Sequence, residues 1–196
     1  MKLLIATRNQ GKRREYEALL AGLGLELVDL TEAGITWEVQ EAGATFEENA
    51  VLKARAYAQA SGLLTLADDS GLEVDALGGE PGVRSARYDG GSDEDCYRLL
   101  LSRLEGVPEQ ERRARFRCVI AIVTPEGAVH TAEDTCEGYI ALRPRGAHGF
   151  GYDPVFFVPE YGSTMAQLPP EVKNRISHRA RAAERAKEIL RRLRGE

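Results

Sequence analysis

The chain has 196 residues, of which 43% are hydrophobic and 29% are charged, and its formal net charge is −5. This balance is typical of a folded globular protein with a substantial core, and it excludes global disorder and general binding of nucleic acid or other polyanions. Three widely spaced cysteines without a CxxC pair argue against a disulfide framework or a zinc site, and no apolar run is long enough for a membrane span, so we expect a cytoplasmic protein.

Apolar runs alternate with helix-forming segments in the first half of the chain, which predicts an α/β fold with some parallel strand pairing. Thr45-Phe46-Glu47-Glu48 fits a capping box at a helix start, and Ser92 is placed to cap a later helix. In chain order, we predict strands at 2–6, 25–30, 63–67, 114–124, 128–136, 137–142 and 154–158, and helices at 12–23, 45–61, 93–104 and from Ser177 onward. The Gly- and Pro-rich stretch 75–91 predicts a structured loop, and we expect one domain over residues 1–196.

Two adjacent carboxylates, Asp68 and Asp69, follow the predicted strand 63–67 and precede Ser70. Because side chains alternate along a strand, the two carboxylates should point to opposite faces, so that one can bind a metal while the other has a different role. Ligands of open α/β sheets gather at the carboxyl ends of strands, where this pair is expected. A turn is the alternative, since Asp, Ser and Gly are all turn residues.

The segment that joins the first strand to the first helix has the composition of a phosphate-binding loop: Thr7, Arg8, Asn9, Gln10, Gly11 and Lys12. Backbone N–H groups at a helix start, a flexible Gly and a Lys together can bind phosphate. It is not a Walker A loop, because the first Gly of that motif is missing and Arg13 stands where a metal-binding Ser or Thr belongs. A solvated lysine at a helix start is the alternative.

Polar and aromatic residues form two further groups in the second half of the chain. The first is the turn Phe150, Gly151, Tyr152 and Asp153, where a ring could stack on a base for about 1–3 kcal/mol or simply pack beneath the turn. The second is Lys173 with His178 and Arg179, which would follow Ser177 as a helix N-cap. Cations there oppose the helix dipole, so Arg179 is more plausible as a ligand contact than as a stabiliser of the helix.

Acidic side chains without a His or Cys cluster favour a hard, oxygen-binding metal ion. Mg²⁺ held by one or two carboxylates and by substrate phosphates is the obvious candidate. Glu41, just ahead of the Thr45 capping box, is a possible second ligand beside Asp69. An exposed loop acid is the alternative for Glu41.

Taken together, these motifs resemble one family, the inosine triphosphate pyrophosphatases, which hydrolyse non-standard purine nucleoside triphosphates. The resemblance runs from Lys2 to about Leu190 and keeps the motifs in the same order. It rests on the segments 6–12, 45–50, 67–72, 77–82, 85–88, 150–154 and 177–179. It implies an elongated α/β fold with a mixed sheet, flanking helices and two lobes around a central nucleotide cleft, a homodimer, and a need for Mg²⁺.

The resemblance also implies a reaction, in which ITP, dITP or XTP and water give the monophosphate and pyrophosphate, and a set of site residues. Asp69 matches the proton acceptor, and Asp69 with Glu41 matches the metal-binding pair. Gln40 stands where relatives often carry a second acid, so Glu38 is an alternative metal ligand. The implied substrate contacts are Thr7, Arg8, Asn9, Gln10, Gly11, Lys12, Ser70, Phe150, Gly151, Tyr152, Asp153, Lys173, His178 and Arg179.

The implied substrates suggest how the base could be read. Arg179 and nearby N–H groups are donors, which suit the 6-keto group of hypoxanthine or xanthine and oppose the 6-amino group of adenine, at about 1–3 kcal/mol for an unmatched buried polar group. Three other functions remain as alternatives. They are a pyrimidine-directed pyrophosphatase of the Maf-like group, a non-catalytic nucleotide-binding module, and a nucleic-acid-binding protein that uses the Arg-rich C-terminal helix.

Overall fold

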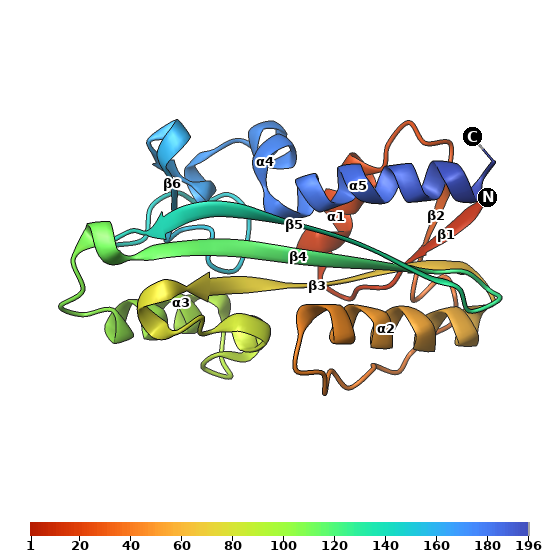
Figure 1. Ribbon diagram of the computed structural model, residues 1–196, viewed down its shortest axis with the longest axis horizontal. Helices are drawn as coiled ribbons and strands as arrows, with labels where there is room; N and C mark the ends of the chain where they lie inside the picture. The colour runs from red at the N-terminus through yellow and green to blue at the C-terminus, as the bar shows by residue number, and fades with distance from the viewer. Residues whose placement is uncertain (196) are drawn as a thin grey trace. The chain divides into compact units, whose positions relative to one another are not determined.

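The computed structural model describes residues 1–195 and has the predicted α/β architecture, a mixed sheet flanked by helices (Figure 1). Its helices and strands are β1 (Lys2–Ile5), α1 (Gln10–Leu19), β2 (Glu26–Asp29), α2 (Phe46–Ser61), β3 (Leu64–Val74), α3 (Asp93–Arg103), β4 (Arg113–Val123), β5 (Val129–Ile140), β6 (Phe156–Val158), β7 (Ser163–Thr164), α4 (Pro170–Ile176) and α5 (His178–Leu193). The strand order is β2-β1-β3-β4-β5-β6-β7. As predicted, part of the pairing is parallel, since β1 is parallel to both β2 and β3, whereas β6 is antiparallel to β5 and β7.

Local signals fixed several helix ends as predicted. The Thr45 side chain accepts a hydrogen bond from the Glu48 backbone N–H and caps α2, and Gly62 ends that helix in the left-handed conformation, with φ of 67°. Glu48 departs from the capping-box pattern, because its carboxylate accepts from the Ala44 N–H, 2.7 Å away. Ser92 caps α3 in a full capping box with Asp95.

Two predicted strands differ in extent from those observed, and two short elements, α4 and β7, were not predicted. The strand predicted to end at residue 67 continues through both carboxylates to Val74, because Leu72 and Val74 are fully buried and extend the core beyond them. Asp68 and Asp69 therefore lie inside a strand, neither at its carboxyl end nor in a turn. The separate strand expected at 137–142 is the continuation of β5, and the short helix α4 was not predicted.

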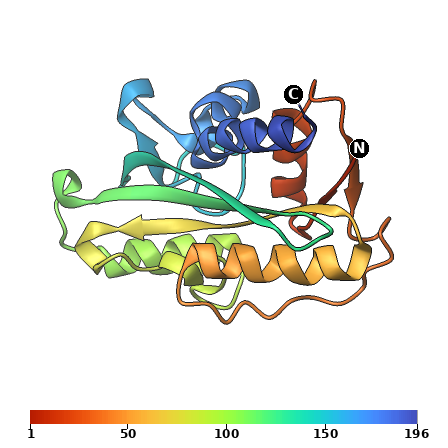
Figure 2. The same ribbon diagram turned by 45° about the vertical axis from the view of Figure 1, so that its right-hand side comes forward.

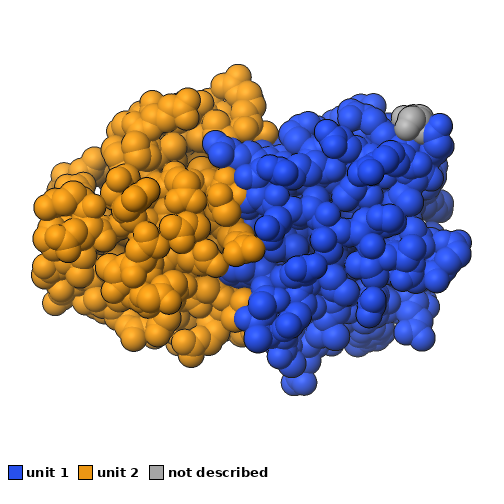
Figure 3. All heavy atoms as spheres, viewed as in Figure 1, with its two compact units in different colours: residues 1–69, 118–134, 179–196 blue, residues 70–117, 135–178 orange. Residues whose placement is uncertain are grey.

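The chain divides into two compact units, which Figure 3 distinguishes by colour. Unit 1 comprises residues 1–69, 118–134 and 179–196, and unit 2 comprises residues 70–117 and 135–178. Strands β3, β4 and β5 each pass from one unit into the other. Among the described residues, no helix combines the length and the apolar character that crossing a bilayer requires.

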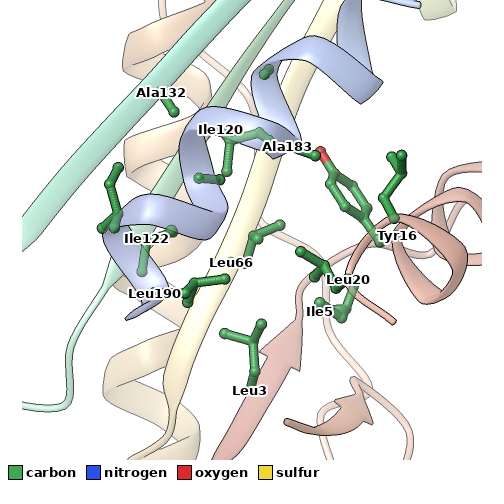
Figure 4. Close-up of a cluster of buried hydrophobic side chains, with 14 of the residues drawn as sticks. Leu3, Ile5, Tyr16, Leu20, Leu66, Ile120, Ile122, Ala132, Ala183 and Leu190 are labelled. Carbon is green, nitrogen blue, oxygen red and sulfur yellow. The ribbon is translucent and has the colours of Figure 1, made fainter. Parts of the chain in front are cut away.

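Unit 1 places helices on both faces of its strands. Helices α1 and α5 lie on one face, and α2 lies on the other (Figures 1 and 2). Leu66 of β3, with Leu64, packs in the hydrophobic cluster that also holds Tyr16 of α1 and Leu190 of α5 (Figure 4). Since β-strand side chains alternate, Asp68 follows Leu64 and Leu66 onto the face of α1 and α5, and Asp69 lies on the face of α2.

Unit 2 has a hydrophobic core of its own. Leu72 of β3, Leu100 of α3, Phe116 of β4 and Phe156 of β6 are buried in one cluster. The rings of Phe116 and Phe156 lie 4.4 Å apart, which adds an aromatic contact to the burial of apolar surface. This core supports the Phe150–Asp153 turn described below.

Candidate active site

The loop before α1 is ordered by its own polar side chains. Asn9 is the N-cap of α1, and its side-chain oxygen accepts from the Lys12 backbone N–H at 3.0 Å. The Asn9 N–H in turn donates to the Thr7 hydroxyl oxygen at 3.2 Å. The helix begins at Gln10 and not at residue 12 as predicted, so Lys12 lies in its first turn. A helix N-terminus and a lysine thus occur together, as the phosphate-loop interpretation requires.

Arg8 has a structural contact that the sequence did not predict. Its guanidinium donates to the carbonyl oxygens of Ile35 and Trp37, at 2.9 and 3.2 Å, and lies 3.2 Å from the carboxylate of Glu38. These contacts tie the loop to the segment 35–38. Glu38 therefore forms an ion pair with Arg8, and its side chain is 71% exposed.

Asp68 is buried among positive charges on the face of α1 and α5. The Lys12 ammonium lies 3.2 Å from Oδ1 and 3.1 Å from Oδ2 of Asp68. Two nitrogens of Arg179, Nε and Nη2, each donate to Asp68 Oδ2 at 3.3 Å. Burial alone would raise the pKa of Asp68, but the charges of Lys12, Arg179 and Lys53 outweigh it and hold that pKa well below its usual range. Asp68 is therefore a permanently ionised partner of these cations.

Asp69 has different surroundings on the face of α2. The buried Asn49 side chain donates from Nδ2 to Asp69 Oδ2 at 2.9 Å and accepts from the Gly43 N–H at 2.8 Å. A Cβ at Gly43 would lie 2.7 Å from Asn49 Oδ1, so the close approach requires glycine there. Burial raises the pKa of Asp69 above its ordinary value, although Lys53 and the Asn49 hydrogen bond oppose this. The adjacent carboxylates thus have pKa values shifted in opposite directions.

Lys53 of α2 links the two aspartates to Glu41. Its ammonium donates to the Glu41 carboxylate at 2.8 Å and to the Asp68 carbonyl oxygen at 2.7 Å. Burial lowers the pKa of Lys53, but the charges of Asp68, Asp69 and Glu41 outweigh it, and the net shift is upward. Glu41 in turn contributes to the raised pKa of Asp69, so it lies within electrostatic reach of that carboxylate. Among the described residues, no group of three or more His, Cys, Asp and Glu side chains is arranged to hold a metal ion.

Unit 2 holds the residues of the predicted aromatic turn. Lys173 pairs with the buried carboxylate of Asp153, which also accepts from the Phe150 N–H at 2.9 Å. The Lys173 ammonium lies 4.5 Å from the centre of the half-buried Phe150 ring. Tyr152 points into the core, and its hydroxyl donates to the Ser85 carbonyl oxygen at 2.8 Å. Of the two rings, Phe150 is the one not committed to the core.

The remaining predicted site residues fall in both units. In unit 2, Gly151 donates its N–H to Asp93, Ser70 lies within β3, and the His178 ring stacks on Phe116 with centres 4.7 Å apart. In unit 1, Arg179 is 1% exposed and also donates to Glu15 at 2.6 Å. His178 and Arg179 open α5, as predicted from Ser177.

Comparison with known proteins assigns the family. A model of the Ham1 family matches residues 3–189. The chain belongs to the Ham1 family. The dITP/XTP pyrophosphatase of Desulforamulus reducens is 54% identical over 195 residues, covering 98% of this chain and 97% of that protein.

Two solved structures match this Ham1 chain closely. A HAM1 protein from Coxiella burnetii has a TM-score of 0.89 at 40% identity, covering 98% of this chain and 99% of its own. The nucleoside-triphosphatase/dITP/XTP pyrophosphatase from Mycobacterium abscessus has a TM-score of 0.77 at 46% identity, covering 95% and 98%. The family resemblance inferred from the motifs is confirmed, and the Maf-like alternative is not supported.

Three polar residues that surround Asp68, Asp69 and Glu41 were not predicted as site residues from the sequence. Asn49 and Lys53 contact Asp69, Glu41 and the Asp68 carbonyl, and Glu15 holds Arg179. The spacing of Asn49 and Lys53 could have revealed them, since residues four apart share one face of a helix. Glu15 gave no such signal, because its partner Arg179 lies 164 residues away in the sequence.

Proposed function

We propose that this Ham1 protein hydrolyses ITP, dITP and XTP to the monophosphate and pyrophosphate and so removes them from the nucleotide pool. Two findings support the proposal: the relatives named dITP/XTP pyrophosphatase match nearly the whole chain, and adjacent carboxylates lie in opposite electrostatic surroundings. The first finding carries it, because the similarity to proteins named for this reaction covers nearly the whole chain.

The metal in this proposal is Mg²⁺, held by Asp69 and Glu41. Their carboxylate oxygens are the ligand type that Mg²⁺ prefers, and one or two such groups suffice when substrate phosphates complete the coordination. Glu41 is favoured over Glu38 by its position, because Lys53 contacts both Glu41 and the Asp68 carbonyl oxygen next to Asp69, whereas Glu38 is largely exposed beside Arg8. When bound, Mg²⁺ would neutralise negative charge on the phosphates.

The protein's own side chains supply the remaining steps. The N-terminal turn of α1 and Lys12, in the segment 7–12, bind phosphate oxygens. Asp69, held by Asn49, orients a water molecule toward the α-phosphorus and accepts its proton. The bond between the α-phosphorus and the oxygen that bridges it to the β-phosphate breaks, and pyrophosphate leaves. Positioning and charge stabilisation provide most of the rate acceleration.

The nucleoside contacts in this proposal come from the other predicted residues. Phe150 offers a ring for stacking, and its neighbours Gly151 and Asp153 offer polar groups. Ser70, Tyr152, Lys173 and His178 complete the predicted contacts. Arg179 stays a predicted reader of the 6-keto group, although three of its donor contacts go to Asp68 and Glu15. The test of its role is an Arg179→Ala variant, for which the KM for ITP should rise more than the KM for ATP.

Pyrophosphate release from ITP, dITP, XTP, GTP, ATP and dTTP, with and without Mg²⁺, tests the function directly. We expect Mg²⁺-dependent turnover that is largely confined to the first three. Preference for dTTP would refute the purine assignment, and binding without turnover would identify a non-catalytic nucleotide module.

Asp69→Asn and Glu41→Gln test the assigned roles. The first should abolish turnover in a folded protein, and the second should raise the Mg²⁺ concentration needed for half-maximal rate. A fully active Asp69→Asn variant would exclude Asp69 as the proton acceptor.

We further propose that residues 1–196 act as one catalytic domain, as a cytoplasmic homodimer that binds neither membranes nor nucleic acid. The three cysteines are buried and form no disulfide among the described residues, which is compatible with a reducing compartment. Light scattering coupled to size exclusion tests the dimer, and a salt-dependent gel shift tests the absence of nucleic-acid binding.

A further inference from the structure

Asp68 forms the centre of a chain of charges within unit 1. Lys12 lies on one side of its carboxylate, and Arg179, which is held in turn by Glu15, lies on the other. The four formal charges, two positive and two negative, cancel. The side chains of Asp68 and Arg179 are 1% and 2% exposed, whereas that of Lys12 is 16% exposed. The chain of charges therefore begins in the interior and ends at a lysine that solvent can reach.

The contacts of Asp68 make it a rigid anchor. Arg179 donates twice to its Oδ2, the Cys118 thiol lies 3.7 Å from the same oxygen, and Lys53 holds its backbone carbonyl. The backbone of Asp68 belongs to β3, while Arg179 of α5 and Cys118 of β4 both contact its carboxylate. It has little freedom to follow Lys12 if the lysine moves.

Lys12, in contrast, is a flexible side chain that gains a defined position only from this anchor. Its ammonium has three donors, and it lies within hydrogen-bonding distance of both oxygens of Asp68. A lysine side chain loses conformational entropy when it is immobilised. If Asp68 immobilises it in the folded protein, a bound phosphate does not have to.

We propose that Asp68 is a positioning residue that holds the Lys12 ammonium ready for substrate phosphate. This rests on the proposed phosphate-binding role of Lys12. Asp68 thus takes the second role expected for the carboxylate pair, beside the metal-binding role of Asp69. It contacts neither substrate nor metal in this scheme.

Asp68→Asn tests the proposal, because it keeps the shape of the side chain and removes the charge that holds Lys12. We expect the KM for ITP and the inhibition constant of tripolyphosphate each to rise about tenfold, as for the weakening of one charge-assisted contact, with a smaller change in kcat. Asp29→Asn is the matched control, since Asp29 pairs with Arg13, the neighbour of Lys12 on α1. It should leave both constants within about twofold, because neither Asp29 nor Arg13 is among the residues assigned to the substrate or to Lys12.

A double-mutant cycle with Lys12→Met distinguishes positioning from a general loss of structure. If Asp68 acts through Lys12, adding Asp68→Asn to Lys12→Met should change neither constant by more than about threefold, since the coupled effects do not add. Full multiplication of the two single effects would overturn the proposal. If Lys12→Met raises both constants but Asp68→Asn raises neither, positioning by Asp68 fails while phosphate binding by Lys12 stands. If Lys12→Met raises neither, the phosphate-binding role of Lys12 fails and the positioning role fails with it.

Asp68→Asn leaves Arg179 with one fewer negative partner in a buried place, which could prevent folding. In that event, the same cycle is measured in the Arg179→Gln background, where the opposing buried charge is also removed. In this background, the proposal still predicts that the effects of Lys12→Met and Asp68→Asn on the two constants do not multiply. Full multiplication would still overturn it.

Discussion

Replacing Asn49 with alanine removes the side chain that connects Asp69 to the loop carrying Glu41. The variant loses the donor to Asp69 Oδ2 and the acceptor for the Gly43 N–H, both in the interior. A neutral hydrogen bond contributes about 0.5–1.5 kcal/mol and one to a charged group about 1.5–3 kcal/mol. We therefore expect Asn49→Ala to lower the free energy of unfolding by about 2–4 kcal/mol and to lower kcat/KM for ITP.

Urea denaturation followed by circular dichroism measures the free energy of unfolding, and pyrophosphate release measures kcat/KM on protein that is folded under assay conditions. Gln59→Ala is the matched control, because it removes an amide from an exposed position of the same helix. A surface substitution of this kind should change stability by no more than about 0.5 kcal/mol. Asn49→Asp separates the two contacts, since it keeps an acceptor for Gly43 and places a second carboxylate beside Asp69.

The Asn49 variants should differ in both stability and activity. Asn49→Asp should lose at least as much stability as Asn49→Ala and should also lose activity, because the new buried carboxylate repels Asp69 where the amide donated to it. The reasoning would be refuted by an Asn49→Ala variant that loses less than about 1 kcal/mol and keeps wild-type kcat/KM.

Three further predictions concern other parts of the molecule. Lys173→Met should destabilise the protein by about 3 kcal/mol in urea denaturation, because it leaves the Asp153 carboxylate buried without its cation; an unchanged midpoint would contradict this. Gly149→Ala should lower the thermal midpoint, because φ is +78° and a Cβ would clash with Asp153 Oδ2. Gly151→Ala is the control, since Gly151 also has a positive φ but has open space around it, and it should lower the midpoint less. Burial raises the pKa of the Cys118 thiol to about 12, so alkylation of Cys118 in the native protein should remain slow from pH 7 to 9, and rapid labelling seen by mass spectrometry would contradict its burial beside Asp68.

What the sequence predicted correctly was mainly local. The Thr45 and Ser92 caps depend on residues three positions away, and the alternating faces of Asp68 and Asp69 depend only on the geometry of an extended chain. The extent of β3 was wrong for a related reason. Asp, Ser and Gly are common in turns, but the buried Leu72 and Val74 beyond them extend the strand through the polar residues.

The partners of the site residues could not be predicted in the same way. Arg179 meets Asp68 across 111 residues and Glu15 across 164, and only the packing of α1, β3 and α5 brings them together. The helix dipole singled out Arg179 as a cation at a helix start, but it could not identify the carboxylates that offset the unfavourable position. Tyr152 is similar, since nothing local predicted that its ring points into the core while Phe150 stays half-buried.

The placement of two consecutive acids within a strand explains how one short motif can serve two tasks. In a turn, neighbouring carboxylates can lie close together, and each would then raise the pKa of the other. In β3 they are separated by the strand itself. Asp68 faces the cations on α1 and α5, which keep it ionised, and Asp69 faces the neutral amide of Asn49, where burial raises its pKa. In the proposed mechanism, β3 thus separates the electrostatic support given by Asp68 from the proton transfer assigned to Asp69.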